Sequence, residues 1–281
     1  MMGDMTKKRQ QHGFSLTETL MAVGTLAIGM TFIGGTFLTG VYFATLSTER
    51  TIGAVAAAEA FAKMRIFGLD VNDPDLKSSG FALYEDIAML PAGETFYPST
   101  RGDVDRQYSW SAICRRVSDA NDANDVSDAN DTPRGGELIQ CVVFVSREIG
   151  GDSSYRKRRS GANWPQLETT RLPCPVRINI AQTAGMSDQV LVKDAVAGDA
   201  IDERTFVSQN SILVDDATGH IYRVLERDKA QPERITLDRV WEGGDLAASE
   251  GGWVWVVPPP VAGGRIPGVA VYQKIIRFPR P

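Results

Sequence analysis

The stretch that decides the fold is GFSLTETLMAVGTLAIGMTFIGGTFLTGVYFATLST, residues 13–48. Its only charged residue is Glu18, so about 30 positions from Thr19 to Thr48 carry no charge. Crossing the ~30 Å hydrocarbon core of a bilayer takes roughly 20 helical residues. The stretch therefore predicts one membrane-spanning helix.

The residues before this helix are polar and basic. The segment MMGDMTKKRQQHG, residues 1–13, carries Lys7, Lys8 and Arg9 against Asp4, and such a positive flank stays in the cytoplasm. A secretory signal peptide has an apolar region of only about 7–15 residues, and this one runs well past that length. We therefore expect a single-pass protein whose C-terminal part lies outside the cytoplasm.

Glu18 lies close to the start of the apolar stretch. Ionisable groups at membrane depth are costly and usually functional. A simpler explanation is a glutamate at the membrane interface, where the helix macrodipole favours a negative charge near the N-terminus. Taken alone, the residue is compatible with both.

The run GFSLTETLMAV, residues 13–23, resembles the type IV prepilin motif. In that family a dedicated peptidase removes a leader ending in Gly and N-methylates the new first residue. The resemblance implies that residues 1–13 are a cleaved leader ending at Gly13, that Phe14 is the mature N-terminus, and that Glu18 acts in assembly. It covers about the first 65 residues, and the continuation looks most like minor pilins and pseudopilins of the V and I classes.

The chain departs from this family at two places. Thr17 precedes the glutamate where an apolar residue is more usual, and the helix-breaking proline of major pilins is absent. Gly34 and Gly35 lie near that proline's usual place, where Gly costs about 1 kcal/mol in a helix interior. Local melting of the helix at this pair is therefore one expectation.

By this resemblance the chain is a minor pilin or minor pseudopilin, a structural subunit of a type IV pilus or a type II secretion pseudopilus. Its partners would be a prepilin peptidase, other pilin or pseudopilin subunits and an assembly platform in the inner membrane. Its location would be that membrane, or a surface or periplasmic filament. In a filament, a neighbour's N-terminal ammonium would neutralise the Glu18 carboxylate and favour correct register. The alternative is an unprocessed, single-pass anchor for a β-rich ligand-binding module.

The helix is expected to continue out of the membrane, because Pro74 is the first proline after residue 13. Residues 14–48 would be its transmembrane half and residues 49–68 an amphipathic half that needs a sheet to cover it. Apolar residues of that half recur at helical spacing: Ile52, Val55, Ala62 and Ile66.

Residues 69–170 are expected to form a pilin-like β head. The segments 108–117 and 137–146 are rich in aromatic and β-branched residues and predict an antiparallel pair of strands. Cys114 and Cys141 would then lie on neighbouring strands.

The loop between these strands, residues 119–136, repeats aspartate every third position. A calcium loop of the EF type starting at Asp119 needs an oxygen ligand at its fifth position, Gly at its sixth and Glu at its twelfth. The chain has Ala123, Asn124 and Asn130 there. A solvated, disordered tip is favoured over a calcium site.

Residues 171–281 are expected to be all β, because short strands alternate with turn signals and no helical periodicity. They form a small barrel or sandwich, as a second module or an elaborated head. Trp241, Trp253 and Trp255 could form a ligand platform, but aromatic residues in strands more often belong to the core. The whole chain is thus α+β: a long helix packed on an antiparallel β head, with an additional C-terminal β module.

Composition argues against several functions. The net charge of −5 gives no reason to expect a nucleic-acid partner, and the basic run 156–159 beside Tyr155 and Trp164 is short. With only His12 and His220, and no hydrolase, metalloprotease or nucleotide-binding motif, we expect no enzymatic activity.

The three cysteines are too far apart for a C-x-x-C metal or redox motif. They are Cys114, Cys141 and Cys174. One disulfide and one free thiol would suit an oxidising compartment, and the sequence does not determine the pairing.

Overall fold

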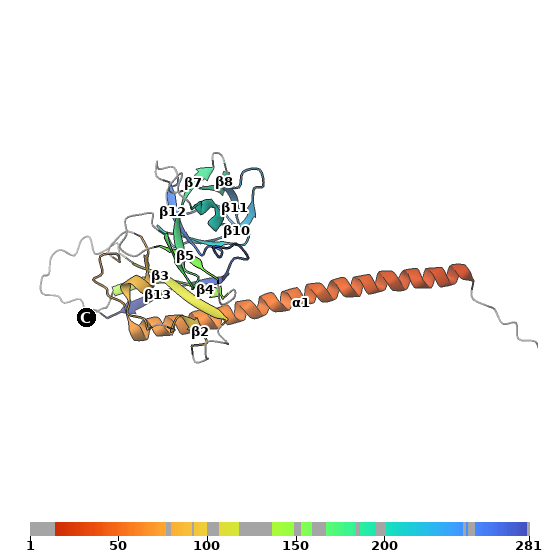
Figure 1. Ribbon diagram of the computed structural model, residues 1–281, viewed down its shortest axis with the longest axis horizontal. Helices are drawn as coiled ribbons and strands as arrows, with labels where there is room; N and C mark the ends of the chain where they lie inside the picture. The colour runs from red at the N-terminus through yellow and green to blue at the C-terminus, as the bar shows by residue number, and fades with distance from the viewer. Residues whose placement is uncertain are drawn as a thin grey trace, which may run out of the picture. The chain divides into compact units, whose positions relative to one another are not determined.

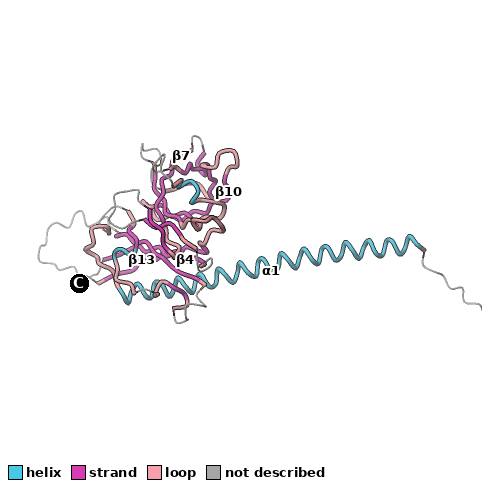
Figure 2. Tube along the Cα trace, viewed as in Figure 1, coloured by secondary structure: helices cyan, strands magenta, loops and turns pink. Residues whose placement is uncertain are grey.

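The computed structural model describes residues 15–76, 80–91, 93–99, 107–117, 137–148, 153–158, 167–183, 186–194, 201–243, 246 and 251–279. Residues up to Glu49 belong to one compact unit and residues from Arg50 onward to another. After the long helix α1, Leu16–Phe67, the described elements are almost all strands (Figure 2). The predicted α+β class is confirmed.

α1 is one uninterrupted helix of 52 residues. It passes through Gly34 and Gly35 without a break, so the expected melting at this pair is not observed. The helix ends at Gly68, which adopts the left-handed conformation with φ 72° and donates its N–H to the Met64 carbonyl at 2.9 Å. The prediction of a continuous helix holds for residues 16–67.

The C-terminal part of α1 is covered by an antiparallel sheet (Figure 1). The strands follow the order β1-β3-β4-β13, and a short strand β2 also pairs with β3. Their bounds are β1 Ala82–Leu83, β2 Phe96–Tyr97, β3 Tyr108–Arg116, β4 Glu137–Arg147 and β13 Gly268–Phe278, with the short helix α2 Tyr84–Ile87 after β1. The predicted β3–β4 pair is confirmed, with Cys114 opposite Cys141.

Of the four residues predicted for the buried face of α1, only Ile52 packs against this core, and it is partly buried. The buried residues recur at helical spacing and are mostly small: Gly53, Ala56, Ala57, Ala60, Phe61 and Met64. Val55 is 51% exposed and Ile66 is 77% exposed. Small side chains bring the helix axis close to the sheet, where Trp110 and Val143 of the strands fill the remaining space.

A buried cation lies beside this face. The Lys63 ammonium contacts the carboxylates of Glu59 at 2.8 Å and Glu94 at 3.0 Å, and donates to the Glu94 carbonyl at 2.7 Å. Trp110 donates its indole N–H to the same carbonyl at 3.1 Å. These bonds tie α1 to the loop before β2 and compensate the desolvation of the ammonium.

The remaining strands form a closed barrel in the order β10-β11-β8-β7-β12-β9. Their bounds are β7 Val176–Thr183, β8 Met186–Val192, β9 Ile212–Asp215, β10 Ile221–Arg227, β11 Arg234–Leu237 and β12 Gly252–Val256. A 3-10 turn, Glu203–Phe206, contributes Phe206 to a core of branched aliphatic side chains such as Ile178, Leu213 and Val254. A barrel was one of the two predicted arrangements.

The last strand does not belong to this barrel. Strand β13 pairs with β4 over its whole length, from Gly268 opposite Ser146 to Phe278 opposite Glu137. The segment 171–281 was expected to be all β, as a second module or an elaborated head, and its last strand, β13, belongs to the head sheet. The barrel is an insertion between two neighbouring strands of the head sheet, preceded by the two-stranded sheet of β5, Tyr155–Arg158, and β6, Leu167–Thr170.

The barrel packs on the sheet face that points away from α1. Ile113, Val142 and Phe144 of the sheet form one buried cluster with Val214 and Trp255 of the barrel. The head sheet is therefore covered on both faces, by α1 on one and by the barrel on the other.

Asp216 provides the polar centre of this joint. Its carboxylate accepts the Phe81 backbone N–H at 3.1 Å and the Trp255 indole N–H at 2.7 Å, and it pairs with Arg177 at 2.7 Å. A buried carboxylate with three donors is fully compensated. The bonds from Phe81 to Asp216 connect the head sheet with the barrel directly.

Candidate processing and assembly site

The N-terminal end of α1 carries the candidate site, and Ser15 positions it. Ser15 is the residue before the first helical residue, and Glu18 is the third residue of the helix. The Glu18 backbone N–H donates to the Ser15 hydroxyl at 3.3 Å, and the Ser15 backbone N–H donates to the Glu18 carboxylate at 3.1 Å. This reciprocal pair is a capping box, which satisfies two backbone donors that the helix leaves without partners.

The role of Ser15 was missed in the sequence, although its signal was present. The residues Ser15-Leu16-Thr17-Glu18 match the S-x-x-E pattern of a capping box. The Thr17 hydroxyl lies 2.7 Å from the Ser15 hydroxyl and extends the network. Thr17, which departs from the family pattern, therefore takes part in the cap.

Glu18 is exposed at this end of the helix. An ionised carboxylate offers about four acceptor sites on two oxygens, and the bond from Ser15 uses one of them. The carboxylate is therefore able to cap its own helix and accept a positive group from outside. Gly13 and Phe14, the other two predicted site residues, lie outside the described residues.

The helix that follows is long and apolar enough to cross a membrane, or to act as a signal sequence, by its length and composition. Six of its threonine hydroxyls donate to carbonyls one turn earlier, at 2.8–3.0 Å, so these hydroxyls are satisfied within the helix. The residues are Thr25, Thr31, Thr36, Thr39, Thr45 and Thr48. Such internal satisfaction is what a bilayer requires of polar groups.

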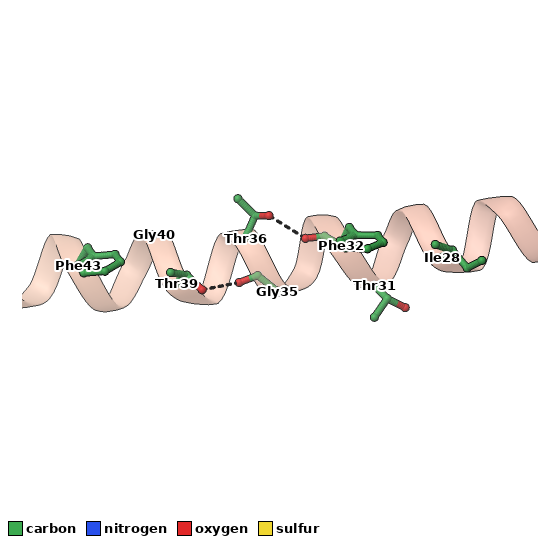
Figure 3. A pocket seen from close by; sticks show the side chains of 8 residues that line it. All are labelled: Ile28, Thr31, Phe32, Gly35, Thr36, Thr39, Gly40 and Phe43. Carbon is green, nitrogen blue, oxygen red and sulfur yellow. Dashed lines mark hydrogen bonds between the residues drawn. The ribbon is translucent and has the colours of Figure 1, made fainter.

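One face of this helix is hollowed. Gly35 and Gly40 leave a shallow groove between Phe32 and Phe43, with Thr36 and Thr39 along it (Figure 3). A Cβ added to any of the five glycines between residues 24 and 40 would meet no atom within 4 Å. Small residues on a membrane helix allow another helix to approach closely.

The structure describes only part of the other two candidate sites, the Asp-rich loop and the basic run. The Asp-rich loop 119–136, considered for calcium, lies outside the described residues, as do Arg159 and Trp164. Within the described ranges, no group of three or more His, Cys, Asp and Glu side chains is placed to hold a metal ion. Lys157 of the basic run pairs with Glu85 at 2.6 Å.

The three tryptophans of the barrel region have structural contacts. Trp255 is buried, Trp253 packs under the Arg177 guanidinium at 4.8 Å, and Trp241 stacks on Tyr222 with 4.6 Å between ring centroids. These contacts fit the expectation that such residues belong to the core or cover it.

Comparison with known proteins gave no match: no family model, no curated protein and no solved structure is significantly similar to this chain.

Proposed function

We propose that this chain is a minor pilin or minor pseudopilin, a processed structural subunit of a type IV pilus or a type II secretion pseudopilus. One observation carries the proposal. A single helix, Leu16–Phe67, has an exposed apolar N-terminal part and a C-terminal part whose small-residue face packs on an antiparallel sheet. A pilin-like architecture of this kind serves a subunit that is stored in a membrane and then transferred to a filament.

In this proposal the two parts of α1 have different tasks. The apolar part, free of charge from Thr19 to Thr48, anchors the precursor in the inner membrane with its head outside the cytoplasm. After removal of residues 1–13 the same part packs among the helices of other subunits. The groove between Phe32 and Phe43 supports this second task, because membrane helices pack through small residues.

Glu18 is proposed to accept the N-terminal ammonium of a neighbouring subunit. Among apolar helices an unpaired carboxylate is costly, so a subunit in the wrong axial register is disfavoured. The acceptor sites left after the Ser15 bond support this role. The partners are then a prepilin peptidase, further pilin or pseudopilin subunits and an inner-membrane assembly platform, and the chain acts without catalysis and without nucleic acid.

The test is coexpression of the full chain with a prepilin peptidase, followed by mass spectrometry of the N-terminus. The expected product lacks residues 1–13 and begins with N-methylated Phe14, and Gly13→Ala reduces the cut. Gly24→Ala is the matched control, because an added Cβ there meets no atom within 4 Å, and it should be cut normally. An intact leader in cells that process other prepilins would favour the unprocessed anchor of a β-rich binding module.

A further inference from the structure

Cys114 and Cys141 lie opposite each other on neighbouring strands of the head sheet. They are register partners in the β3–β4 ladder, and their sulfur atoms are 3.2 Å apart. Both side chains are fully buried, on the side of the sheet that α1 covers.

The register places this pair at a position suited to a covalent bond. Val117 donates its N–H to the carbonyl of its partner Leu138, and Glu148 donates to Gln107, both at 2.9 Å. Bonded and non-bonded pairs alternate along an antiparallel ladder, so the Cys114–Cys141 pair falls on a non-bonded position. At such positions the Cα atoms are about 4.5 Å apart, within the range that disulfides span.

Cys174 is excluded as a partner by the sheet itself. It belongs to the buried cluster of Ile113 and Val142, whose side chains point to the barrel side of the sheet. Successive side chains of a strand alternate between faces, which puts Cys114 and Cys141 on the opposite side. The backbone of two strands separates Cys174 from the pair.

We propose that Cys114 and Cys141 form a disulfide in the mature protein, while Cys174 stays a thiol. The proposal rests on the proposed function in one respect, the location of the head in an oxidising compartment. One thiolate attacks an external protein disulfide and forms a mixed disulfide, and the second thiolate displaces the oxidant from it. The two cysteines thereby lose two electrons and two protons, and the external disulfide that takes them up is reduced to a dithiol.

Burial determines when this exchange takes place. Burial and the neighbouring Cys141 thiol raise the pKa of Cys114 well above its ordinary value, so the folded pair contains little of the reactive thiolate. An external oxidant also cannot reach sulfur atoms that α1 covers. The bond therefore forms before the Ala56–Met64 face of α1 packs on the sheet, and afterwards it resists reductant.

The bond would fasten the long hairpin between β3 and β4, whose connection includes the Asp-rich segment 119–136. Closing a loop of this size restricts the unfolded chain. Its loss is expected to lower the midpoint of thermal unfolding by about 6–12 °C in a chain of this length.

The test uses the full chain expressed with its leader in cells that have an oxidising periplasm, and solubilised in detergent. The protein is unfolded in the presence of an alkylating reagent, digested and analysed by mass spectrometry. We expect a peptide pair linked through Cys114 and Cys141, and alkylation of Cys174 alone. Reduction in denaturant followed by refolding with reductant should give the lower thermal midpoint without any substitution.

Two variants complete the design. Cys114→Ala should leave two alkylated thiols, Cys141 and Cys174, while Cys174→Ala should leave the linkage intact and no thiol to alkylate. Three alkylated cysteines in leader-cut protein would overturn the disulfide and leave the processing intact. The Cys114–Cys141 linkage in uncut protein would confirm the disulfide and count against the processing, and any linkage through Cys174 would overturn the pairing.

Discussion

Ser15 and Glu18 exchange two hydrogen bonds across the first turn of α1, so the proposed assembly carboxylate is also part of the helix cap. Glu18 is thus expected to cap the helix within one subunit and to pair with a neighbouring subunit in the filament. The two tasks depend on different properties, since capping needs an acceptor and the contact needs a negative charge.

The substitution Glu18→Gln separates these tasks. Glutamine is accepted at this position of a capping box, so helix content should be unchanged, whereas incorporation into filaments should fall strongly because the charge is lost. Circular dichroism of the full chain in micelles measures the helix, and the amount of protein in sheared filaments measures assembly.

Ser15→Ala is the complementary variant. It removes a cap worth about 0.5–2 kcal/mol and leaves the carboxylate in place, so assembly should persist while the first turn frays. Normal assembly of the Glu18→Gln variant would contradict the proposed charge pairing.

The small-residue face of α1 gives a second prediction. Ala60 is fully buried against the sheet, and Ala58 is exposed two positions earlier. Ala60→Leu should lower the free energy of unfolding by about 1–3 kcal/mol through overpacking, and Ala58→Leu should leave it nearly unchanged. Chemical denaturation of the full chain in micelles compares the two, and equal stabilities would contradict the assigned face.

Except for Ile52, the residues predicted for the buried face of the helix are exposed, and the reason is physical. In residues 49–68 apolar residues occur on both sides, so spacing alone does not select the buried one. Choosing the larger residues Val55 and Ile66 favoured the side that is exposed. The sheet supplies the bulk of this core through Trp110, Ile139 and Val143, which requires small residues on the helix.

Local patterns predicted the strands but not all of their partners. The strand at residues 269–278 was predicted, yet nothing near it in the chain indicates that it pairs with β4 instead of the barrel. By contrast, β3 and β4 are consecutive, so their pairing followed from the hairpin between them. The cap at Ser15 is predictable from the S-x-x-E pattern of residues 15–18, a local signal that needs no knowledge of the tertiary structure.

The joint between barrel and sheet gives a third prediction. Asp216→Ala removes the acceptor of two N–H donors and the partner of Arg177, and it should cost about 2–3 kcal/mol of stability. Asp202→Ala is the control, because Asp202 also pairs with an arginine, Arg204 at 2.7 Å, but is far more exposed. Asp202 also caps the turn Glu203–Phe206 by accepting the Arg204 backbone N–H, so its loss should cost about 0.5–1 kcal/mol, as measured by denaturation. A larger effect at Asp202 would contradict the role of Asp216.

Alkaline pH should distinguish the reduced from the oxidised protein. The folded-state pKa of the Cys114 thiol is raised above its unfolded value of about 8.5. Its contribution to stability is complete below that value and is lost as pH rises toward the folded-state pKa, because the unfolded chain releases the proton first. Above about pH 8.5, where the unfolded cysteine begins to ionise, the reduced form should become less stable as pH rises.

The disulfide form has no proton to lose at this position, so its stability should change less over the same interval. Burial also raises the pKa of Cys174, and the comparison is therefore made in the Cys174→Ala background. Thermal midpoints across the pH series are the measurement. Parallel curves for the two forms would show that the Cys114 thiol is not responsible.

The position of β13 after the barrel strands in the chain bears on the order in which the head sheet is completed. Apart from Val269, which lies at a register shift, the residues of β13 pair with residues of β4 that are more than 120 positions earlier in the chain. Until β13 has left the ribosome, this edge of β4 has unpaired backbone groups. The barrel between them is able to fold in the meantime, because its six strands close on one another. The head sheet, and with it the surface that receives α1, is therefore completed only after β13 has been synthesised, so a chain terminated before β13 cannot form that surface.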